Sequence, residues 1–513
     1  MERERIGIMG GSFNPIHERH VEMAQCAMKE YKLDRVIFLP TGNPPHKHEE
    51  LAEASHRYEM TRLAIFGLPG MEPSRMELER EGTIYTVDTL TLMKKRMGDA
   101  QLFYMIGEDT MVDLPNWRKP DKVFSLCQFI VCCRSTEEPK RHPVYEELLQ
   151  RGAKLRFLSL PPRDVSSTAI RKALAAGEEP VGLSPQVMEY IRMMGLYGVP
   201  PCPQGAAQMY SRLRKALTDK RLVHSLLVAW TARQLAEKHG LNPEQAELAG
   251  LLHDCAKCLP LSQQQAIARE HRLLLDKETL QSESILHGYA GAALAESEYG
   301  VKDVSVLAAI RCHTTGKVGM LPLDMAVYLA DKIEPSRRSY PALEEVRTMA
   351  ETDLLAATIR SLRSTLDYVA QRGGTTHPAT RRALEWLERM QREKEKKEAE
   401  DKIKEYTSVI DDMGHFVGLN LNLDEVNSCE FVQVRFGALP KENVEKLAVY
   451  KDNPDVIFTP CTTDDKYQWG VYFTPITAAS SVDRIFSSLK FERVELNELK
   501  GSPEAIVADV RAK

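Results

Sequence analysis

Residues 5–20 read RIGIMGGSFNPIHERH, in which a short apolar run leads into two glycines and then a segment with two histidines. The apolar run predicts a buried strand, and the residues that follow predict the start of a helix. Gly10 and Gly11 would let the backbone approach a phosphate closely, and a helix N-terminus offers free N–H groups to an anion. His17 and His20, three residues apart, would face the same anion. The stretch matches neither the GK[ST] phosphate loop nor the GxGxxG dinucleotide motif.

The alternation of apolar runs and helical stretches continues to about residue 195. Such an alternation predicts an α/β domain in which helices cover a parallel sheet. The runs that we expect to form its strands are 6–9, 36–39, 102–106, 129–132 and 155–158.

The remainder of the chain divides into regions of different pattern. A length of 513 residues predicts about three domains at a typical size of about 150 residues each. Segment 209–392 has helical periodicity nearly throughout, and the alternating runs after it predict a small α+β domain. We therefore expect an α/β domain at 1–197, a Pro/Gly-rich linker at 198–208, an all-α domain at 209–392, a charged helix at 393–404 and an α+β tail at 405–513.

The composition limits the classes of function. A net charge of -5 leaves no general basic surface for nucleic acid or anionic lipid, although a local phosphate site is compatible with it. No apolar run has the length of a membrane span, and the chain start does not look like a signal peptide. We expect a cytoplasmic protein with no nucleic-acid partner, whose ten cysteines are reduced.

Further motifs place the amino-terminal region in a family. They are PPHK at 44–47, YTVDTL at 85–90, GED at 107–109, LPNW at 114–117 and VSSTAIR at 165–171. Together with the glycine–histidine stretch, they resemble the bacterial nicotinate mononucleotide adenylyltransferases, Rossmann-like nucleotidyltransferases. Arg19 stands where that family usually has glycine, and its side chain would either obstruct the turn or add a phosphate contact.

The resemblance implies attack of the mononucleotide phosphate on the α-phosphate of ATP, with release of pyrophosphate and formation of nicotinate adenine dinucleotide. Alignment and charge neutralisation are the main requirements of such a transfer. The implied phosphate-binding residues, working with Mg²⁺, are His17, His20, Lys47 and Arg171. Nucleotide contacts are implied for Gly10, Gly11, Ser12, Phe13, Thr86, Asp109, Trp117, Arg134, Ser167 and Thr168, with Thr86, Asp109 and Trp117 on the pyridine side. Ser167 and Thr168 would also cap a helix.

Six side chains in the helical region are candidate metal ligands. Imidazole and carboxylate together suit first-row divalent metals, and the core of a helix bundle is where ligands from several helices converge. The six candidates are His224, His253, Asp254, His287, His313 and Asp331.

The sequence around these candidate ligands resembles the HD superfamily of metal-dependent phosphohydrolases. The segments RLVHS at 221–225, GLLHDCAK at 250–257, HTTG at 313–316 and LADKIEP at 329–335 are similar to a bacterial subfamily that hydrolyses diadenosine tetraphosphate symmetrically. The resemblance implies one or two divalent metals bridged by Asp254, with iron as the first candidate and manganese or magnesium as alternatives. It also implies that Lys257 and Arg337 neutralise polyphosphate, although either could be a surface charge.

The tail resembles part of the cytoplasmic region of V-type ATPase subunit I, at 431–440 (FVQVRFGALP) and 471–475 (VYFTP). It carries no catalytic constellation, and we predict either a protein-interaction module or a fusion without function. The hypothesis for the chain is a bifunctional enzyme acting on ATP, nicotinate mononucleotide and diadenosine tetraphosphate. The alternatives are that one domain only binds or senses nucleotides, that the helical domain hydrolyses another nucleotide, or that the chain is a scaffold.

Overall fold

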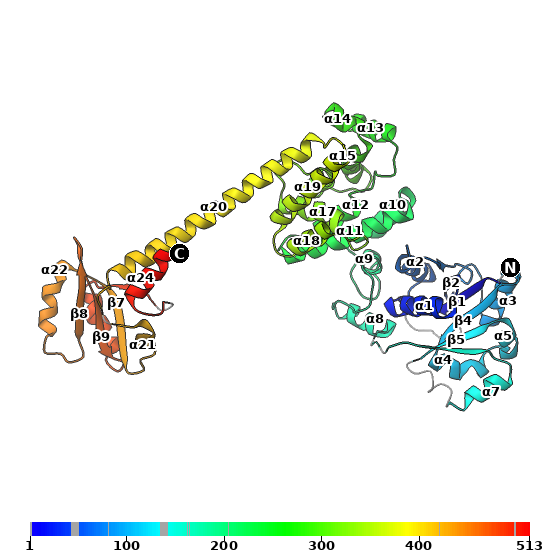
Figure 1. The fold of residues 1–513 in the computed structure, drawn as a ribbon, viewed down its shortest axis with the longest axis horizontal. Helices are drawn as coiled ribbons and strands as arrows, with labels where there is room; N and C mark the ends of the chain where they lie inside the picture. Colours follow the sequence, from blue (N-terminus) through cyan, green and yellow to red (C-terminus); the bar gives the residue numbers. More distant parts are fainter. Residues whose placement is uncertain are drawn as a thin grey trace. The chain divides into compact units, whose positions relative to one another are not determined.

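The chain forms two compact units, Met1–Glu388 and Arg389–Lys513 (Figure 1). The computed structural model describes residues 3–513 except 43–50, 81, 134–141, 162, 164, 204, 420 and 497–498. The predicted fold class is confirmed: a parallel α/β part, an all-helical part and a small α+β part follow one another along the chain. None of the helices in the described segments combines the length and apolar character needed to cross a membrane.

Six parallel strands form the amino-terminal sheet, in the order β3-β2-β1-β4-β5-β6. Strands β2 and β3 are added on one side of β1, and strands β4 to β6 are added on its other side. The topological switch point therefore lies between β1 and β4, which is where ligands bind in open parallel sheets. The five predicted strands are present with slightly different ends, and β3 was not predicted. The strands are β1 (Arg5–Gly11), β2 (Arg35–Pro40), β3 (Met71–Pro73), β4 (Gln101–Gly107), β5 (Gln128–Cys133) and β6 (Leu155–Ser159).

Helices cover both faces of this sheet because alternate strand residues point to opposite sides. In β4, Phe103 and Met105 belong to the hydrophobic cluster that includes α1, α2, α8 and α9, whereas Leu102 and Tyr104 belong to the cluster that includes α3, α5 and α7. The helical elements are α1 (Glu18–Tyr31), α2 (Ala54–Ala64), α3 (Thr86–Met97), α4 (Glu108–Asp113), the 3₁₀ turn η1 (Leu114–Asn116), α5 (Pro120–Leu126), α7 (Val144–Gln150), α8 (Ser167–Ala175) and α9 (Pro185–Met194).

The all-helical part packs directly on α9. One hydrophobic cluster runs without interruption from Phe38 in the sheet through Ile191 in α9 and Leu213 in α10 to Leu226 in α11. The segment predicted as a linker therefore joins two parts that share a core. The helices of this part are α10 (Ala206–Ala216), α11 (Asp219–Lys238), α12 (Pro243–Leu252), α13 (Leu261–Glu270), α14 (Lys277–Gln281), α15 (Glu283–Ser297), α16 (Val304–Cys312), α17 (Pro322–Ile333), α18 (Pro341–Ala350) and α19 (Leu354–Gln371).

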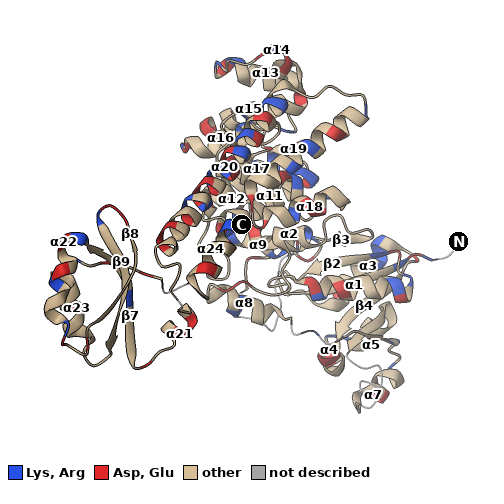
Figure 2. Ribbon diagram, turned by 60° about the vertical axis from the view of Figure 1, so that its left-hand side comes forward, with Lys and Arg blue, Asp and Glu red and all other residues tan. Residues whose placement is uncertain are grey.

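Helix α20 (Pro378–Gly414) contains the predicted charged helix and is longer than predicted at both ends. Its exposed turns carry Lys and Arg interspersed with Asp and Glu (Figure 2). In the second unit, an antiparallel sheet of order β10-β7-β9-β8 has a separate apolar cluster on each face. Its elements are α21 (Leu423–Asn427), β7 (Val432–Pro440), α22 (Lys441–Val444), the 3₁₀ turn η2 (Glu445–Tyr450), β8 (Ile457–Thr463), β9 (Tyr467–Pro475), α23 (Ala479–Ser488), β10 (Glu492–Val494) and α24 (Pro503–Ala512).

Buried charges lie where α9 packs against the helical part. Glu247 on α12 is fully buried and accepts hydrogen bonds from Arg233 (2.7 Å) and Arg192 (3.5 Å). Glu189 on α9 is also fully buried, and neither of its carboxyl oxygens has a hydrogen-bond partner in the described structure. Burial, together with the neighbouring charge of Glu247, raises the pKa of Glu189 well above its usual value.

Replacing Glu189 with glutamine is expected to stabilise the chain in neutral and basic solution. Because the folded pKa of Glu189 is raised, its contribution is fully present below the unfolded pKa of about 4.3 and is lost as the pH rises toward the folded value. Glutamine resembles the protonated acid and does not titrate. Thermal melts of Glu189→Gln and the unaltered chain should coincide near pH 4 and differ by about 2–4 °C at pH 8.

A matched control is Glu296→Gln, which changes an exposed glutamate on α15. This control should melt like the unaltered chain at every pH. Equal melting temperatures of Glu189→Gln and the control at pH 8 would contradict the raised pKa.

Candidate active sites

The predicted phosphate turn lies at the switch point of the sheet. Gly10 and Gly11 end β1, and Gly107, which ends the adjacent strand β4, is the N-cap of α4. A Cβ atom on Gly10 would lie 2.2 Å from the Tyr104 hydroxyl oxygen, so the absence of a side chain there makes room for Tyr104. The close approach that Gly10 allows in the structure is thus to the protein itself, whereas the prediction assigned it to a phosphate.

Two stacked imidazoles stand at the start of α1. His17 is its N-cap, and its ring centroid lies 3.8 Å from that of His20 in the first turn. The backbone N–H of His17 donates to Nδ1 of His20 (3.3 Å), and the buried Nδ1 of His17 has no hydrogen-bond partner among the described residues. Burial, with a contribution from Arg19, lowers the pKa of His17 to about 4, and burial also lowers the pKa of His20. Both rings are neutral at pH 7.

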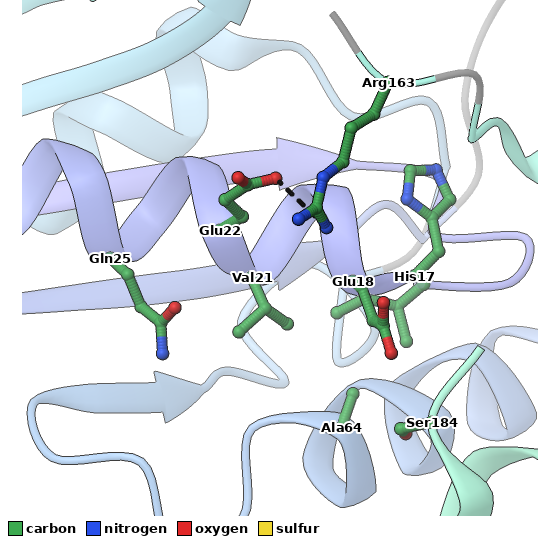
Figure 3. Close-up of a pocket in the computed structure, with 9 residues that line it drawn as sticks. His17, Glu18, Val21, Glu22, Gln25, Ala64, Arg163 and Ser184 are labelled. Atoms are coloured by element: carbon green, nitrogen blue, oxygen red, sulfur yellow. Dashed lines mark ion pairs between the residues drawn. The ribbon is translucent and has the colours of Figure 1, made fainter. Parts of the chain in front are cut away.

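The Arg19 side chain does not enter the glycine turn. Its Nη1 atom forms an ion pair with Glu22 Oε2 one turn along α1, at 3.0 Å. Arg163 Nη1 lies 3.9 Å from the same oxygen of Glu22. A cleft of about 360 Å³ opens next to His17 and is lined by Glu22 and Arg163 (Figure 3). Of the two alternatives for Arg19, obstruction of the turn is not observed.

The sequence analysis missed Arg57, an arginine that joins two loops near the predicted phosphate turn. Arg57 on α2 is buried, and its guanidinium donates to the carbonyl oxygens of Ser12 (2.8 Å), Thr41 (2.6 Å) and Ala52 (2.9 Å). These bonds connect the loop after β1 to the loop after β2. In the sequence, a single arginine within an ordinary helical pattern gave no signal of this role.

Helix α8 is tied to the same loop. Arg171 Nη1 donates to the carbonyl of Asn14 (2.8 Å), and the Ser167 hydroxyl donates to the carbonyl of Pro15 (2.9 Å). The side chain that caps α8 is that of Ser166, which accepts from Ala169 N, so the predicted capping by Ser167 and Thr168 is wrong. The capping oxygen must precede the first helical residue, and the helix begins at Ser167.

The other residues predicted to contact nucleotide lie on different elements and differ in exposure. Thr86 is the first residue of α3, Asp109 is an exposed residue in the first turn of α4, and the Trp117 ring meets the Tyr104 ring edge-on at 6.0 Å. The Phe13 side chain is buried against His20, so only its backbone can face a ligand. Lys47 and Arg134 lie outside the described residues.

Replacing Arg57 with lysine should weaken both the fold and the transfer site. A lysine ammonium cannot span three carbonyls as a planar guanidinium does, and each lost hydrogen bond to a charged group costs about 1.5–3 kcal/mol. Because the Ser12 loop shifts, we expect kcat/KM for adenylyl transfer to fall by up to about 100-fold.

Steady-state kinetics and thermal melts would measure the two effects, with Arg96→Lys on the exposed face of α3 as the control. Hydrolysis should be unaffected. Unchanged transfer in Arg57→Lys would contradict the positioning role.

The six predicted metal ligands come together in the helical part. His224 lies in α11, His253 and Asp254 follow α12, His287 lies in α15, His313 follows α16 and Asp331 lies in α17, and all six are buried. Two groups can each hold one ion, with ligand atoms within 4.8 Å of one another: His224, His253 and Asp254 in one, and Asp254, His287 and His313 in the other. Asp254 belongs to both groups.

The two carboxylate oxygens of Asp254 face different histidines. Oδ1 lies 3.1 Å from His287 Nε2 and 3.6 Å from His313 Nε2, whereas Oδ2 lies 3.4 Å from His253 Nε2. A carboxylate placed in this way can bridge two cations. Six candidate ligands lying far apart would have contradicted the predicted metal site, but the structure brings them together.

Hydrogen bonds at the outer ring nitrogens fit a metal site. Nδ1 of His253 bonds the carbonyl of Gly250, and Nδ1 of His313 bonds the carbonyl of Ile310, both at 2.7 Å. A carbonyl only accepts, so Nδ1 carries the proton and Nε2 keeps a lone pair that faces inward. The buried Nε2 of His253 has no hydrogen-bond partner in the described structure, as expected for an atom that binds a metal.

Cations surround the two carboxylates. Arg221 pairs with Asp254 at 2.5 Å, while Lys332 and Arg337 pair with Asp331 at 2.9 and 2.8 Å. Against the effect of burial, charges and hydrogen bonds hold the pKa of each aspartate well below its usual value.

Lys257 Nζ lies 3.3 Å from Nδ1 of His287, and burial lowers the pKa of both residues, that of His287 to about 4. Glu334 accepts a hydrogen bond from His224 Nδ1 at 3.1 Å. The sequence analysis assigned no role to Arg221, Lys332 or Glu334. Their position inside the same short motifs as the candidate ligands is the sequence signal that could have identified them.

Family models match both parts of the first unit. Residues 8–173 match the cytidylyltransferase-like model, and residues 221–336 match the HD domain model. The fold and the two sites thus define a nucleotidyltransferase-type domain joined to an HD-type domain.

Relatives contain the same combination. A Mycoplasma genitalium protein named "Probable nicotinate-nucleotide adenylyltransferase/Ap4A hydrolase" is 30% identical over 336 residues, which cover 66% of this chain and 89% of that protein. The chain belongs to the family of these two-domain proteins. A "Probable nicotinate-nucleotide adenylyltransferase" from Thermoanaerobacter sp. is 40% identical over 205 residues, covering 38% of this chain and 96% of that protein. A solved structure from Clostridium acetobutylicum, described as a predicted HD superfamily hydrolase involved in NAD metabolism, is 38% identical. The match covers 35% of this chain and 95% of that chain, with a TM-score of 0.34.

Proposed function

We propose that the chain transfers the adenylyl group of ATP to nicotinate mononucleotide and also hydrolyses diadenosine tetraphosphate to two ADP. The observation that carries this function is the presence, in one compact unit, of an imidazole-bearing glycine turn at a sheet switch point and a cluster of six buried candidate metal ligands. The names and two-domain composition of the Mycoplasma relatives support both activities.

In the transfer site, the mononucleotide phosphate oxygen attacks the α-phosphorus of ATP, and pyrophosphate leaves as the P–O bond to the β-phosphate breaks. His17 and His20 are neutral, so they serve as hydrogen-bond donors to phosphate oxygens and do not supply charge. Arg171, fixed through its bond to Asn14, and Lys47 supply positive charge. Mg²⁺ bound with ATP would neutralise further phosphate charge.

In the hydrolytic site, one or two divalent ions, iron first and manganese or magnesium as alternatives, would lower the pKa of water and polarise a phosphoryl oxygen. The tautomers fixed by Gly250 and Ile310 present the His253 and His313 lone pairs for binding. Arg221, Lys257 and Arg337 would neutralise the polyphosphate. Attack of water on an inner phosphorus breaks the central P–O bridge and gives two ADP.

For residues 405–513 we propose either contact with a protein partner or a fusion without function, the two alternatives that the sequence leaves open. The described part of this tail contains no group of three or more side chains arranged to hold a metal. Its likeness to V-type ATPase subunit I stays a prediction.

The test is an assay of the purified chain with separate substrates. ATP with nicotinate mononucleotide should give nicotinate adenine dinucleotide, and diadenosine tetraphosphate with Fe²⁺, Mn²⁺ or Mg²⁺ should give only ADP. Chromatography separates ADP from the ATP and AMP of asymmetric cleavage. ATP and AMP as products, or no cleavage with any of the three metals, would contradict the hydrolytic assignment.

A further inference from the structure

A second cleft adjoins the metal-ligand cluster. It has a volume of about 250 Å³ and lies between the end of α17, the following loop, α18 and α19. Three cationic side chains line it, Lys332, Arg337 and Arg338, and no carboxylate is among its described lining residues. This charge favours an anionic occupant.

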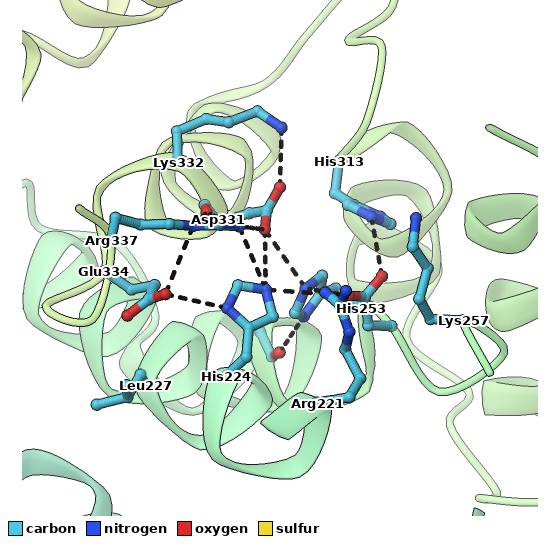
Figure 4. A network of polar contacts seen from close by, with 12 residues as sticks. Arg221, His224, Leu227, His253, Lys257, His313, Asp331, Lys332, Glu334 and Arg337 are labelled. Carbon is cyan, nitrogen blue, oxygen red and sulfur yellow. Dashed lines mark hydrogen bonds and ion pairs between the residues drawn. The ribbon is translucent and has the colours of Figure 1, made fainter. Parts of the chain in front are cut away.

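Two of these cations also touch the candidate metal site. Lys332 Nζ lies 2.9 Å from Asp331 Oδ2, and Arg337 Nη2 lies 2.8 Å from Asp331 Oδ1 (Figure 4). An anion held by these two cations would therefore lie next to the Asp331 carboxylate, which is one of the six candidate metal ligands. Arg338 makes no ion pair in the described structure and is exposed, so its charge remains available to a ligand.

The rest of the cleft suits a nucleoside. Leu343 and Val346, both buried residues of α18, form an apolar floor, and Tyr340, which is 53% exposed, stands next to them. Across the cleft, Ser361 and Ser364 lie three residues apart on one face of α19. An aromatic ring and hydroxyl groups are what a base and a ribose require.

We propose that this cleft binds one nucleoside diphosphate half of the dinucleotide substrate, with the diphosphate on Lys332, Arg337 and Arg338 and the nucleoside between Tyr340 and α19. The proposal rests on the proposed hydrolytic function and adds the site of one leaving group. With a volume of about 250 Å³, the cleft is too small to enclose the whole dinucleotide.

The experiment compares Arg338→Ala with Arg381→Ala in the full chain loaded with Mn²⁺. Both arginines are exposed, but Arg381 on α20 is not in the cleft. Hydrolysis of diadenosine tetraphosphate gives kcat and KM, and inhibition of that hydrolysis gives a Ki for ADP that reports on this site and not on the transfer site. In Arg338→Ala we expect KM and the Ki of ADP each to rise roughly tenfold, with kcat within about twofold.

Inorganic pyrophosphate as a second inhibitor separates phosphate binding from nucleoside binding. Arg338→Ala should weaken inhibition by both ADP and pyrophosphate, whereas Tyr340→Ala should weaken inhibition by ADP alone. Values of KM and Ki in Arg338→Ala equal to those of Arg381→Ala would overturn the subsite while leaving the hydrolytic function intact. Absence of hydrolysis by the unaltered chain would overturn the proposed function and the subsite with it.

Discussion

Asp254→Ala is expected to abolish hydrolysis and leave adenylyl transfer within about twofold of the unaltered chain. Its two oxygens face separate histidine groups, so one substitution removes a ligand from both candidate ion sites. Loss of a residue that only supports a metal ligand typically costs 10–100-fold, so loss of a shared ligand should cost about 1,000-fold or more. Elemental analysis should show metal content falling in parallel.

The control for this change is Asp367→Asn, an exposed carboxylate on α19. It should hydrolyse diadenosine tetraphosphate normally. Equal loss of both activities in Asp254→Ala, with a normal melting temperature, would mean that the two reactions share one site. Retained hydrolysis with normal metal content would remove Asp254 from the ligand set.

His17→Ala should lower kcat for adenylyl transfer by about 100- to 1,000-fold, the usual cost of removing one preorganised hydrogen-bond donor from a reacting phosphate or carbonyl. The ring is buried and neutral at the N-terminus of α1, and burial keeps its pKa near 4. Because negative charge on the phosphates grows toward the transition state, KM for the mononucleotide should change much less than kcat.

Initial rates at varied ATP and mononucleotide concentrations would separate these effects, and His271→Ala in the helical part is the control. A rise in KM alone would show that His17 contributes to ground-state binding only. Hydrolysis should be the same in both variants.

The sequence predicted those elements whose periodicity is long enough to recognise. Strands β2, β4 and β5 each carry four or more consecutive apolar residues, whereas β3 has three residues, one of them proline. The same limit applies to β10, an edge strand of the second sheet, which also has three residues. Edge strands contribute little buried surface, so their sequences carry little pattern.

Site residues were predictable where the residue type itself implies the chemistry. Histidines and aspartates from separate helical segments were predicted to be metal ligands, and the structure brings all six together. Arg57 and Glu334 were missed because their roles depend on where loops and neighbouring helices lie in space. Ser166 was passed over for its neighbour because the helix start was uncertain by one residue.

The hydrophobic cluster that continues from the sheet through α9 into the helical part links the stability of the two parts that carry the two reactions. Because the two parts share this cluster, we expect them to unfold together and heat to inactivate both reactions at the same temperature. A substitution that destabilises either part would therefore lower the cellular amount of both activities at once. The stability of one part would not change independently of the stability of the other.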